Sequence, residues 1–286
     1  MKRKNQKKTA QHEPKIVYYN DELNDDFAGT HIKAKTIDKN FKYVHKNPFW
    51  KFFTFFVYNV IAIPVVTIYC KLFKRVKFVN RKAVRKAQRK QKNGMFFYGN
   101  HTAVIDAYTP NIISIPRRNK ILVSPDTVSI KGMKNIIQLL GGVPVPNDIS
   151  GMRNFTKAVE YYNKKGYNIT IFPEAHIWPY YTGVRNFKDS SFAYPVLTNS
   201  PVFAFFTAYS KPKGLFAKHR KANITVYVSD AFYPDLTKTK KEAQKELRDK
   251  CYNFMKECSE KYTEFVYIDY QPAAPTETNQ TQINKS

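Results

Sequence analysis

With 286 residues, of which 43% are hydrophobic and 15% aromatic, the chain is long enough to bury a sizeable core, which excludes a wholly disordered protein. Its 48 Lys and Arg against 22 Asp and Glu give a net charge of +26, which favours a polyanionic partner such as an anionic membrane surface or nucleic acid. The three cysteines have no zinc-type spacing and are too sparse for a disulfide framework, a pattern typical of a reducing compartment.

The first part of the chain predicts two segments, a basic polar N-terminal arm over residues 1–45 and a membrane-associated helical segment over 46–80. Residues 52–70 contain no charged side chain. As a helix they would extend about 28 Å, close to the roughly 30 Å of bilayer hydrocarbon. We favour membrane insertion. Because Asn59 and Pro64 interrupt the run, an interfacial hairpin kinked at Pro64 remains an alternative, as does a buried core helix.

A strongly basic stretch follows the apolar run directly. Residues 71–92 contain eleven Lys or Arg and no acid. Such a stretch attracts anionic lipid by about 1 kcal/mol per residue near the surface and marks its side of the membrane as cytoplasmic. We therefore predict a cell-membrane protein, peripheral or single-pass, with its catalytic domain on the cytoplasmic side. A solvated helical face or a nucleic-acid patch is the alternative.

Residues 81–270 alternate short apolar runs with helical patterns, which predicts one α/β domain, a mixed sheet flanked by helices. The helix over 151–164 is expected to have Ser150 as its N-cap and to stop at Gly166. The tail, 271–286, is Pro/Thr/Gln/Asn-rich and is predicted to be disordered. The predicted strands are 95–98, 120–123, 143–145, 169–172, 202–206 and 224–229. The predicted helices are 105–115, 133–140, 151–164, 189–199 and 237–262.

Two short motifs follow predicted strands and carry the chemistry. His101 and Asp106 lie five positions apart after the first of these strands, and Phe172-Pro173-Glu174 ends the fourth. A His at a strand end beside a carboxylate can remove a proton from a hydroxyl at neutral pH, since the carboxylate fixes the tautomer and stabilises the imidazolium. We predict His101 as the general base and Asp106 as its orienting carboxylate.

These motifs, with residues 141–146 and the later 187–188 and 201–204, resemble the glycerophospholipid acyltransferase family, typified by 1-acylglycerol-3-phosphate O-acyltransferase. That family carries N-H-x-x-x-x-D, then a Gly-containing block, then F-P-E-G-T-R. The order and spacing agree over roughly residues 94–208. Two positions depart from the pattern: Ala175-His176-Ile177 replaces Gly-Thr-Arg, and Asn147 stands where an Arg is common.

The resemblance implies how the acceptor is bound. In the family the two missing arginines are associated with the acceptor's phosphate. Charge alone suggests Arg185 as a replacement, and Lys188 matches a family Lys. The predicted substrate-binding residues are Phe172, Pro173, Glu174, Arg185 and Lys188.

The resemblance predicts a membrane-bound O-acyltransferase that moves a fatty acyl group from acyl-CoA or acyl carrier protein to a lysophospholipid, with 1-acylglycerol-3-phosphate as acceptor and phosphatidic acid as product. The expected partners are anionic membrane lipid, the acceptor and the donor, without nucleic acid, metal or bound cofactor. A different lysolipid or glycolipid acceptor is one alternative. A membrane-anchored nucleic-acid-binding protein is another, and a hydrolase or metal site formed by His101, Asp106, Glu174 and His176 is a third.

Overall fold

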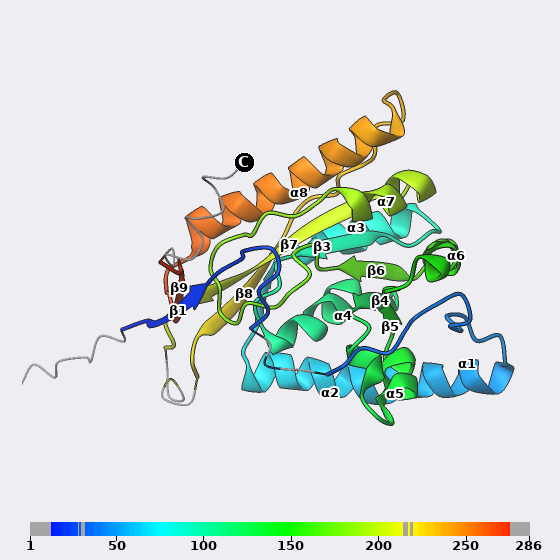
Figure 1. Cartoon of the computed structure of the whole chain (residues 1–286), viewed down its shortest axis with the longest axis horizontal. Coiled ribbons are helices and arrows are strands. Elements are labelled where there is room, and N and C mark those ends of the chain that lie inside the picture. The colour runs from blue at the N-terminus through cyan, green and yellow to red at the C-terminus, as the bar shows by residue number, and fades with distance from the viewer. Residues whose placement is uncertain (1–12, 28, 30–31, 214–216, 218–219, 275–286) are drawn as a thin grey trace, which may run out of the picture.

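The computed structural model describes residues 13–27, 29, 32–213, 217 and 220–274, and a seven-stranded sheet forms its centre (Figure 1). The strands of this sheet are β2 (Lys77–Val79), β3 (Phe96–Gly99), β4 (Asn119–Val123), β5 (Gly142–Pro144), β6 (Asn168–Ile171), β7 (Val202–Ser210) and β8 (Asn223–Val228). Their order is β2-β8-β7-β3-β6-β4-β5. Strands β7, β3, β6, β4 and β5 run parallel, and β8 is antiparallel to β7. The predicted mixed sheet is confirmed.

Helices cover both faces of the sheet, as predicted (Figure 1). They are α3 (Arg81–Lys90), α4 (Thr109–Ser114), α5 (Met133–Leu139), α6 (Met152–Lys164), α7 (Ala193–Thr198) and α8 (Lys240–Tyr262). Alternate residues of β3 divide between two hydrophobic clusters: Phe96 and Tyr98 pack toward α6 and α8, and Phe97 packs toward α3 and α4. This two-sided burial explains why the strands are apolar at nearly every position.

The apolar run forms one long helix, Pro48–Phe73, which is long and apolar enough to cross a membrane. It comprises α1 (Pro48–Phe55), a π-helical stretch Phe56–Ala62, α2 (Ile63–Ile68) and a second π-helical stretch Tyr69–Phe73. Asn47 caps its start by accepting a hydrogen bond from the Phe49 N–H at 2.8 Å. The hairpin kinked at Pro64 does not form, and the chain stays helical through this residue. The π-helical stretch before Pro64 accommodates the backbone hydrogen bond that proline cannot donate.

One face of this helix packs on the α/β domain, and the rest is exposed. Tyr58 and Cys70 are buried, and the Tyr58 hydroxyl donates to the Asn111 side chain at 3.0 Å. Phe52, Phe56, Val65 and nine other large apolar or aromatic side chains of this helix are more than a third exposed. The helix is therefore not the core helix that was one alternative, since only 11% of its most apolar window is buried.

The predicted boundary at residue 45 is wrong. Strand β1 (Lys15–Tyr19) pairs in parallel with β9 (Ile268–Pro272), far along the chain. Ile37 and Tyr43 then enter the hydrophobic cluster beside α6. Residues 13–27 and 32–45 are thus part of the folded domain, and β9 extends two residues into the predicted tail. The remainder of the arm, residues 1–12, and of the tail, residues 275–286, lies outside the described residues.

Of the two predictions made for the ends of α6, the one for its start is wrong and the one for its end is confirmed. Ser150 is not its N-cap: the Asp148 carboxylate accepts a hydrogen bond from the Ser150 N–H at 2.8 Å and starts the preceding turn. Gly166 does end the helix, in the left-handed conformation (φ +80°) that glycine adopts without strain. Neither β2 nor α3 was predicted, because the dense positive charge of residues 71–92 hides the short apolar face formed by Val84 and Ala87.

Candidate active site

The site begins where β3 ends. Asn100 follows the strand and extends its ladder to β7, since its side chain accepts from the Thr207 N–H at 2.8 Å and donates to the Thr207 carbonyl at 3.3 Å. Gly99 lies against the ring of Phe205, which a side-chain carbon at residue 99 would overlap at 2.2 Å. Close packing and a side-chain clamp thus fix the backbone just before His101, at the carboxyl edge of the parallel strands.

His101 and Asp106 meet as predicted. The His101 Nδ1 lies 3.2 Å from the Asp106 Oδ2. Asp106 is fully buried in a short 3-10 helix, Val104–Ala107, and its Oδ2 also accepts the N–H groups of Thr102 at 2.7 Å and Ala103 at 2.8 Å. These backbone donors fix the position of the carboxylate. The turn between the two residues is therefore built around Asp106.

The imidazole has one packed face and one open edge. Its ring stacks on Phe172, with centroids 4.4 Å apart and planes at 21°, and Phe172 in turn packs edge-on against Phe205. The His101 side chain keeps 24% of its surface exposed, whereas Asp106 has none. With Nδ1 turned toward Asp106, Nε2 is the nitrogen that can accept a proton from a bound hydroxyl.

Glu174 is buried and connects the two motifs. Its Oε2 accepts from the His101 backbone N–H and from the Arg185 guanidinium, both at 3.2 Å, and its Oε1 accepts from the Arg185 N–H at 3.2 Å. Burial raises the pKa of Glu174 above its usual value, and Arg185 with the two backbone donors opposes that rise. The Glu174 carboxylate thus fixes the position of the His101 backbone.

Arg185 does not occupy the position expected of a phosphate ligand. Its side chain is 1% exposed, and besides Glu174 it donates to the backbone carbonyls of His176 and Glu22. The guanidinium also lies 4.8 Å from the ring of Trp178. These contacts show that Arg185 holds Glu174 and its loop together. Lys188, by contrast, is exposed.

The loop after Glu174 is tied to the His101 turn by backbone hydrogen bonds. The Trp178 N–H donates to the His101 carbonyl at 3.0 Å, and the Tyr180 N–H donates to the Thr102 carbonyl at 2.7 Å. Trp178 is fully buried, stacked on Tyr270 of β9 and bonded through its indole N–H to the Asp25 carbonyl. It is thus a core residue of this loop.

The two residues that depart from the family pattern, Ala175 and Asn147, each have a distinct local role or conformation in the structure. Ala175 adopts the left-handed conformation (φ +64°), where a glycine would be unstrained. Asn147 accepts from the Ile37 N–H at 2.8 Å and donates to the Lys35 carbonyl at 3.2 Å. Asn147 therefore anchors the N-terminal segment. His176 lies 3.6 Å from the Asp26 carboxylate, away from the pairing of His101 with Asp106.

Sequence reasoning missed the support that β7 gives to the site. The Tyr209 hydroxyl donates to the Thr102 carbonyl at 3.1 Å, and the Thr207 hydroxyl lies 3.5 Å from the Asp106 Oδ1. Both side chains belong to the last residues of β7, a strand that was predicted to end at residue 206. The alternation of Thr207, Ala208 and Tyr209 continues the strand pattern and would have extended it. Pro173 and Phe172, both half-buried, lead the chain out of β6.

Chemically, the arrangement suits deprotonation of a hydroxyl at Nε2 of His101, followed by return of that proton to a leaving group. The hydrolase and metal alternative required four residues to converge. Within the described ranges, no group of three or more His, Cys, Asp or Glu is placed to hold a metal ion.

Comparisons with known proteins agree with this geometry. Residues 75–206, which include both motifs, match the family model described as Acyltransferase. The fold is similar to the crystal structure of the 1-acyl-sn-glycerophosphate (LPA) acyltransferase PlsC from Thermotoga maritima, with a TM-score of 0.50, 16% sequence identity, and coverage of 76% of this chain and 89% of that chain. At this identity the likeness shows the fold. No curated protein matches the chain.

Proposed function

We propose that this chain, whose residues 75–206 match the Acyltransferase family model, moves a fatty acyl group from acyl-CoA or acyl carrier protein to the free hydroxyl of a lysophospholipid. The proposed acceptor is 1-acylglycerol-3-phosphate and the product phosphatidic acid. The observation that carries the proposal is the contact between His101 and buried Asp106 at the carboxyl edge of the sheet. The similarity of the fold to that of the LPA acyltransferase PlsC from Thermotoga maritima supports the choice of acceptor.

The reaction follows from this geometry without a covalent enzyme intermediate, because a thioester is already activated. Nε2 of His101 takes the proton of the acceptor hydroxyl, and the oxygen attacks the thioester carbonyl to form a tetrahedral oxyanion. As the oxyanion collapses, the C–S bond breaks and the imidazolium returns its proton to the departing thiolate. Asp106 stabilises the imidazolium while it exists, at a contact of 3.2 Å.

We infer that Lys188, and not Arg185, contacts the acceptor's phosphate. Arg185 is enclosed by Glu174, Trp178 and backbone carbonyls, so exposed Lys188 is the remaining candidate of the two cations. A lysine ammonium is a point charge and grips a phosphate less specifically than a bidentate guanidinium. A phosphodiester lysolipid is therefore the second acceptor class that the structure favours.

The exposed face of the helix Pro48–Phe73 supports membrane association, and its packing supports an interfacial position. Tyr58 and Cys70 pack this helix lengthwise against the α/β domain. The surface of that domain is rich in charge. A helix crossing the bilayer along its full length would pull that polar domain into hydrocarbon, at a cost of several kcal/mol per unsatisfied group. The proposed site of action is the cytoplasmic membrane surface, with this helix lying in the plane of the interface.

An assay of the purified full chain in nonionic detergent tests the proposed reaction. We expect transfer of labelled acyl groups from acyl-CoA or acyl carrier protein to 1-acylglycerol-3-phosphate, and a loss of roughly 10²–10⁴-fold for His101→Ala. His176→Ala, which removes another partly exposed imidazole, is the matched control and should retain activity. Absence of transfer to any lysophospholipid, or more than a few per cent of activity in His101→Ala, would contradict the proposal.

A further inference from the structure

A cavity of about 280 Å³ lies at the edge of the sheet opposite the candidate active site. It is bounded by α1, by the start of β4 and by residues around the end of α6 and the start of β6. Strands β3, β4 and β6 are parallel, so the amino ends of β4 and β6 face this cavity and their carboxyl ends face away from it. From Tyr167 to Phe172 the chain covers about 16 Å, at roughly 3.3 Å per residue, which is too far for direct contact with the acylated atoms.

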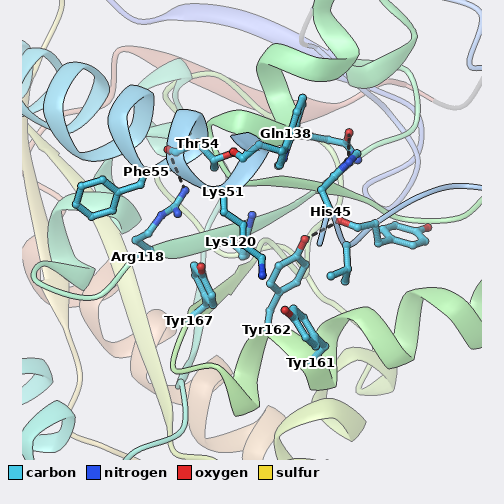
Figure 2. A pocket seen from close by; sticks show the side chains of 14 residues that line it. His45, Lys51, Thr54, Phe55, Arg118, Lys120, Gln138, Tyr161, Tyr162 and Tyr167 are labelled. Carbon is cyan, nitrogen blue, oxygen red and sulfur yellow. Dashed lines mark hydrogen bonds between the residues drawn. The ribbon is translucent and has the colours of Figure 1, made fainter. Parts of the chain in front are cut away.

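Three cations from two distant parts of the sequence meet at this cavity. Figure 2 shows Arg118 and Lys120 reaching into the space beside helix α1, which contributes Lys51. Lys120 is only 6% exposed, and its Nζ lies 4.5 Å from the centre of the Tyr162 ring. The Arg118 guanidinium lies between two other rings, 4.6 Å from that of Tyr58 and 5.5 Å from that of Tyr167.

These cations have no counter-charge in the fold. No Asp or Glu lines the cavity, and neither Lys120 nor Arg118 forms an ion pair with any residue that the structure describes. The buried Arg118 Nε has no hydrogen-bond partner within the same residues, although another guanidinium nitrogen donates to the Thr54 carbonyl at 3.4 Å. The Lys120 ammonium lies near the rings of Tyr162 and Tyr167. Aromatic faces stabilise a desolvated cation by less than the free energy that burying an unpaired charge costs.

We propose that this cavity binds a phosphate group, with buried Lys120 and half-buried Arg118 as its ligands and Lys51 as the third cation. A phosphate offers acceptor oxygens to the three donors of an ammonium and to the unpaired Arg118 Nε–H, and its negative charge offsets the buried positive charges. The cavity has room for it, since a single water requires only about 15 Å³. The side chains of Tyr161, Tyr162 and Tyr167 line the cavity.

The place of this phosphate site in the fold suggests where the phosphate comes from. The helix that supplies Lys51 also exposes Phe49 (77%) and Phe52 (67%). If this apolar face lies in lipid, the cavity lies at the depth of the headgroups, where lipid phosphates are abundant. A soluble phosphate compound offers the same chemistry, so the source is separated by experiment.

Phosphorus NMR and thermal unfolding of the full chain in nonionic detergent test the proposal with three probes: inorganic phosphate, glycerophosphoglycerol and dioctanoylphosphatidylglycerol. We expect at least one probe to raise the unfolding temperature and to broaden its phosphorus signal at constant ionic strength. Lys120→Met should weaken that binding at least tenfold, and Arg118→Gln should weaken it as well. Lys245→Gln removes an exposed charge on α8 and should leave it unchanged.

The pattern of binding identifies the source. Binding of inorganic phosphate or glycerophosphoglycerol that depends on Lys120 supports a site for soluble phosphate compounds. Binding of the lipid alone, again dependent on Lys120, supports a headgroup site. The proposal is overturned if none of the probes binds the wild-type chain, or if Lys120→Met binds them as tightly as Lys245→Gln does. Because each comparison is made within one variant with and without probe, a change in basal stability does not obscure the result.

Discussion

The imidazole of His101 stacks on the phenyl ring of Phe172, with the two centroids 4.4 Å apart and the ring planes at 21°. The two residues are 71 positions apart in the sequence and are brought together because β3 and β6 are neighbours in the sheet. Asp106 fixes one nitrogen of the imidazole, and the Phe172 ring fixes its plane. Together they direct Nε2 toward the open edge of the site.

Phe172→Leu should lower kcat by roughly 10–100-fold, since a misplacement of a reacting group by about 1 Å costs on the order of 10²-fold. The side chain stays apolar, so the unfolding temperature should change little. Steady-state kinetics with acyl-CoA and 1-acylglycerol-3-phosphate measure the effect. Phe254→Leu, at a half-buried position on α8, is the control and should leave kcat unchanged. A loss seen only in KM would mean that Phe172 binds substrate without orienting His101.

Asp106→Asn should reduce turnover by roughly 10²–10⁴-fold, because an amide cannot stabilise the imidazolium as a carboxylate does. It should also lower stability by about 1–3 kcal/mol, since its NH₂ group faces the backbone donors of Thr102 and Ala103 or turns toward His101. Kinetics and chemical unfolding of the same preparation separate the two effects. Thr207→Val tests the weaker 3.5 Å contact and should change turnover far less. Near-normal kcat in a folded Asp106→Asn protein would contradict the assignment.

Ala175→Gly should stabilise the protein by about 1 kcal/mol, because a residue with a side chain pays roughly that much in the left-handed region and glycine does not. Part of the gain is lost to the greater entropy of glycine in the unfolded chain. Ala231→Gly, at a loop position without positive φ, should show only the loss. Denaturant unfolding of both variants decides the matter, and equal changes in both would show that Ala175 is not strained.

The main features of the fold could be predicted because each central strand is a short apolar run bounded by turn residues, and the six predicted strands match β3 to β8 within a few residues. Periodicity also located α6 and α8. The pairing of β1 with β9 could not be predicted, because both are short, half-exposed edge strands whose partner lies some 250 residues away. Such pairing depends on tertiary contacts and not on local pattern.

At the site, the meeting of His101 with Asp106 could be predicted, because five positions separate them within one turn. The role of Arg185 could not. An arginine on the surface and an arginine buried beside Glu174 cannot be distinguished in the sequence. The two side chains come within 3.2 Å of each other only because the loop from 174 to 185 folds back on itself. The cavity lined by Arg118 and Lys120 was missed for the same reason. Its cations form a site only together with the tyrosines and α1, which the fold brings beside them.

Arg185→Met should lower the free energy of unfolding by several kcal/mol without selectively raising KM for the acceptor. Removing one partner of a buried ion pair typically costs about 3–5 kcal/mol, because the other charge stays buried. The double variant Glu174→Gln/Arg185→Met should regain part of the loss. Lys188→Ala, in contrast, should raise KM for 1-acylglycerol-3-phosphate at unchanged kcat, a loss of uniform binding. A stable Arg185→Met protein with a strongly raised KM would restore Arg185 as a phosphate ligand.

The buried ammonium of Lys120 makes stability depend on pH. Burial, with the charge of Arg118 as a smaller cause, lowers the pKa of Lys120 to about 7, whereas an unfolded lysine has a pKa of about 10.4. Between these values the unfolded chain binds more protons than the folded one, so stability rises with pH at up to about 1.4 kcal/mol per pH unit. The destabilisation is fully present below about pH 7 and disappears above about pH 10.

Lys120→Met keeps a side chain of similar shape and removes this dependence. The variant should therefore be more stable than wild type by a few kcal/mol at pH 6.5, in the absence of phosphate, and the difference should shrink steadily as the pH approaches 9.5. The other titratable groups around the cavity, namely Lys51, Arg118, His45, Tyr161, Tyr162 and Tyr167, are common to both proteins and largely cancel in the comparison. Guanidinium unfolding in detergent across this range measures the difference, with exposed Lys245→Met as the control that should track wild type at every pH. A gap between Lys120→Met and wild type that stays constant from pH 6.5 to 9.5 would show that Lys120 titrates as an ordinary lysine and carries no buried charge for a phosphate to offset.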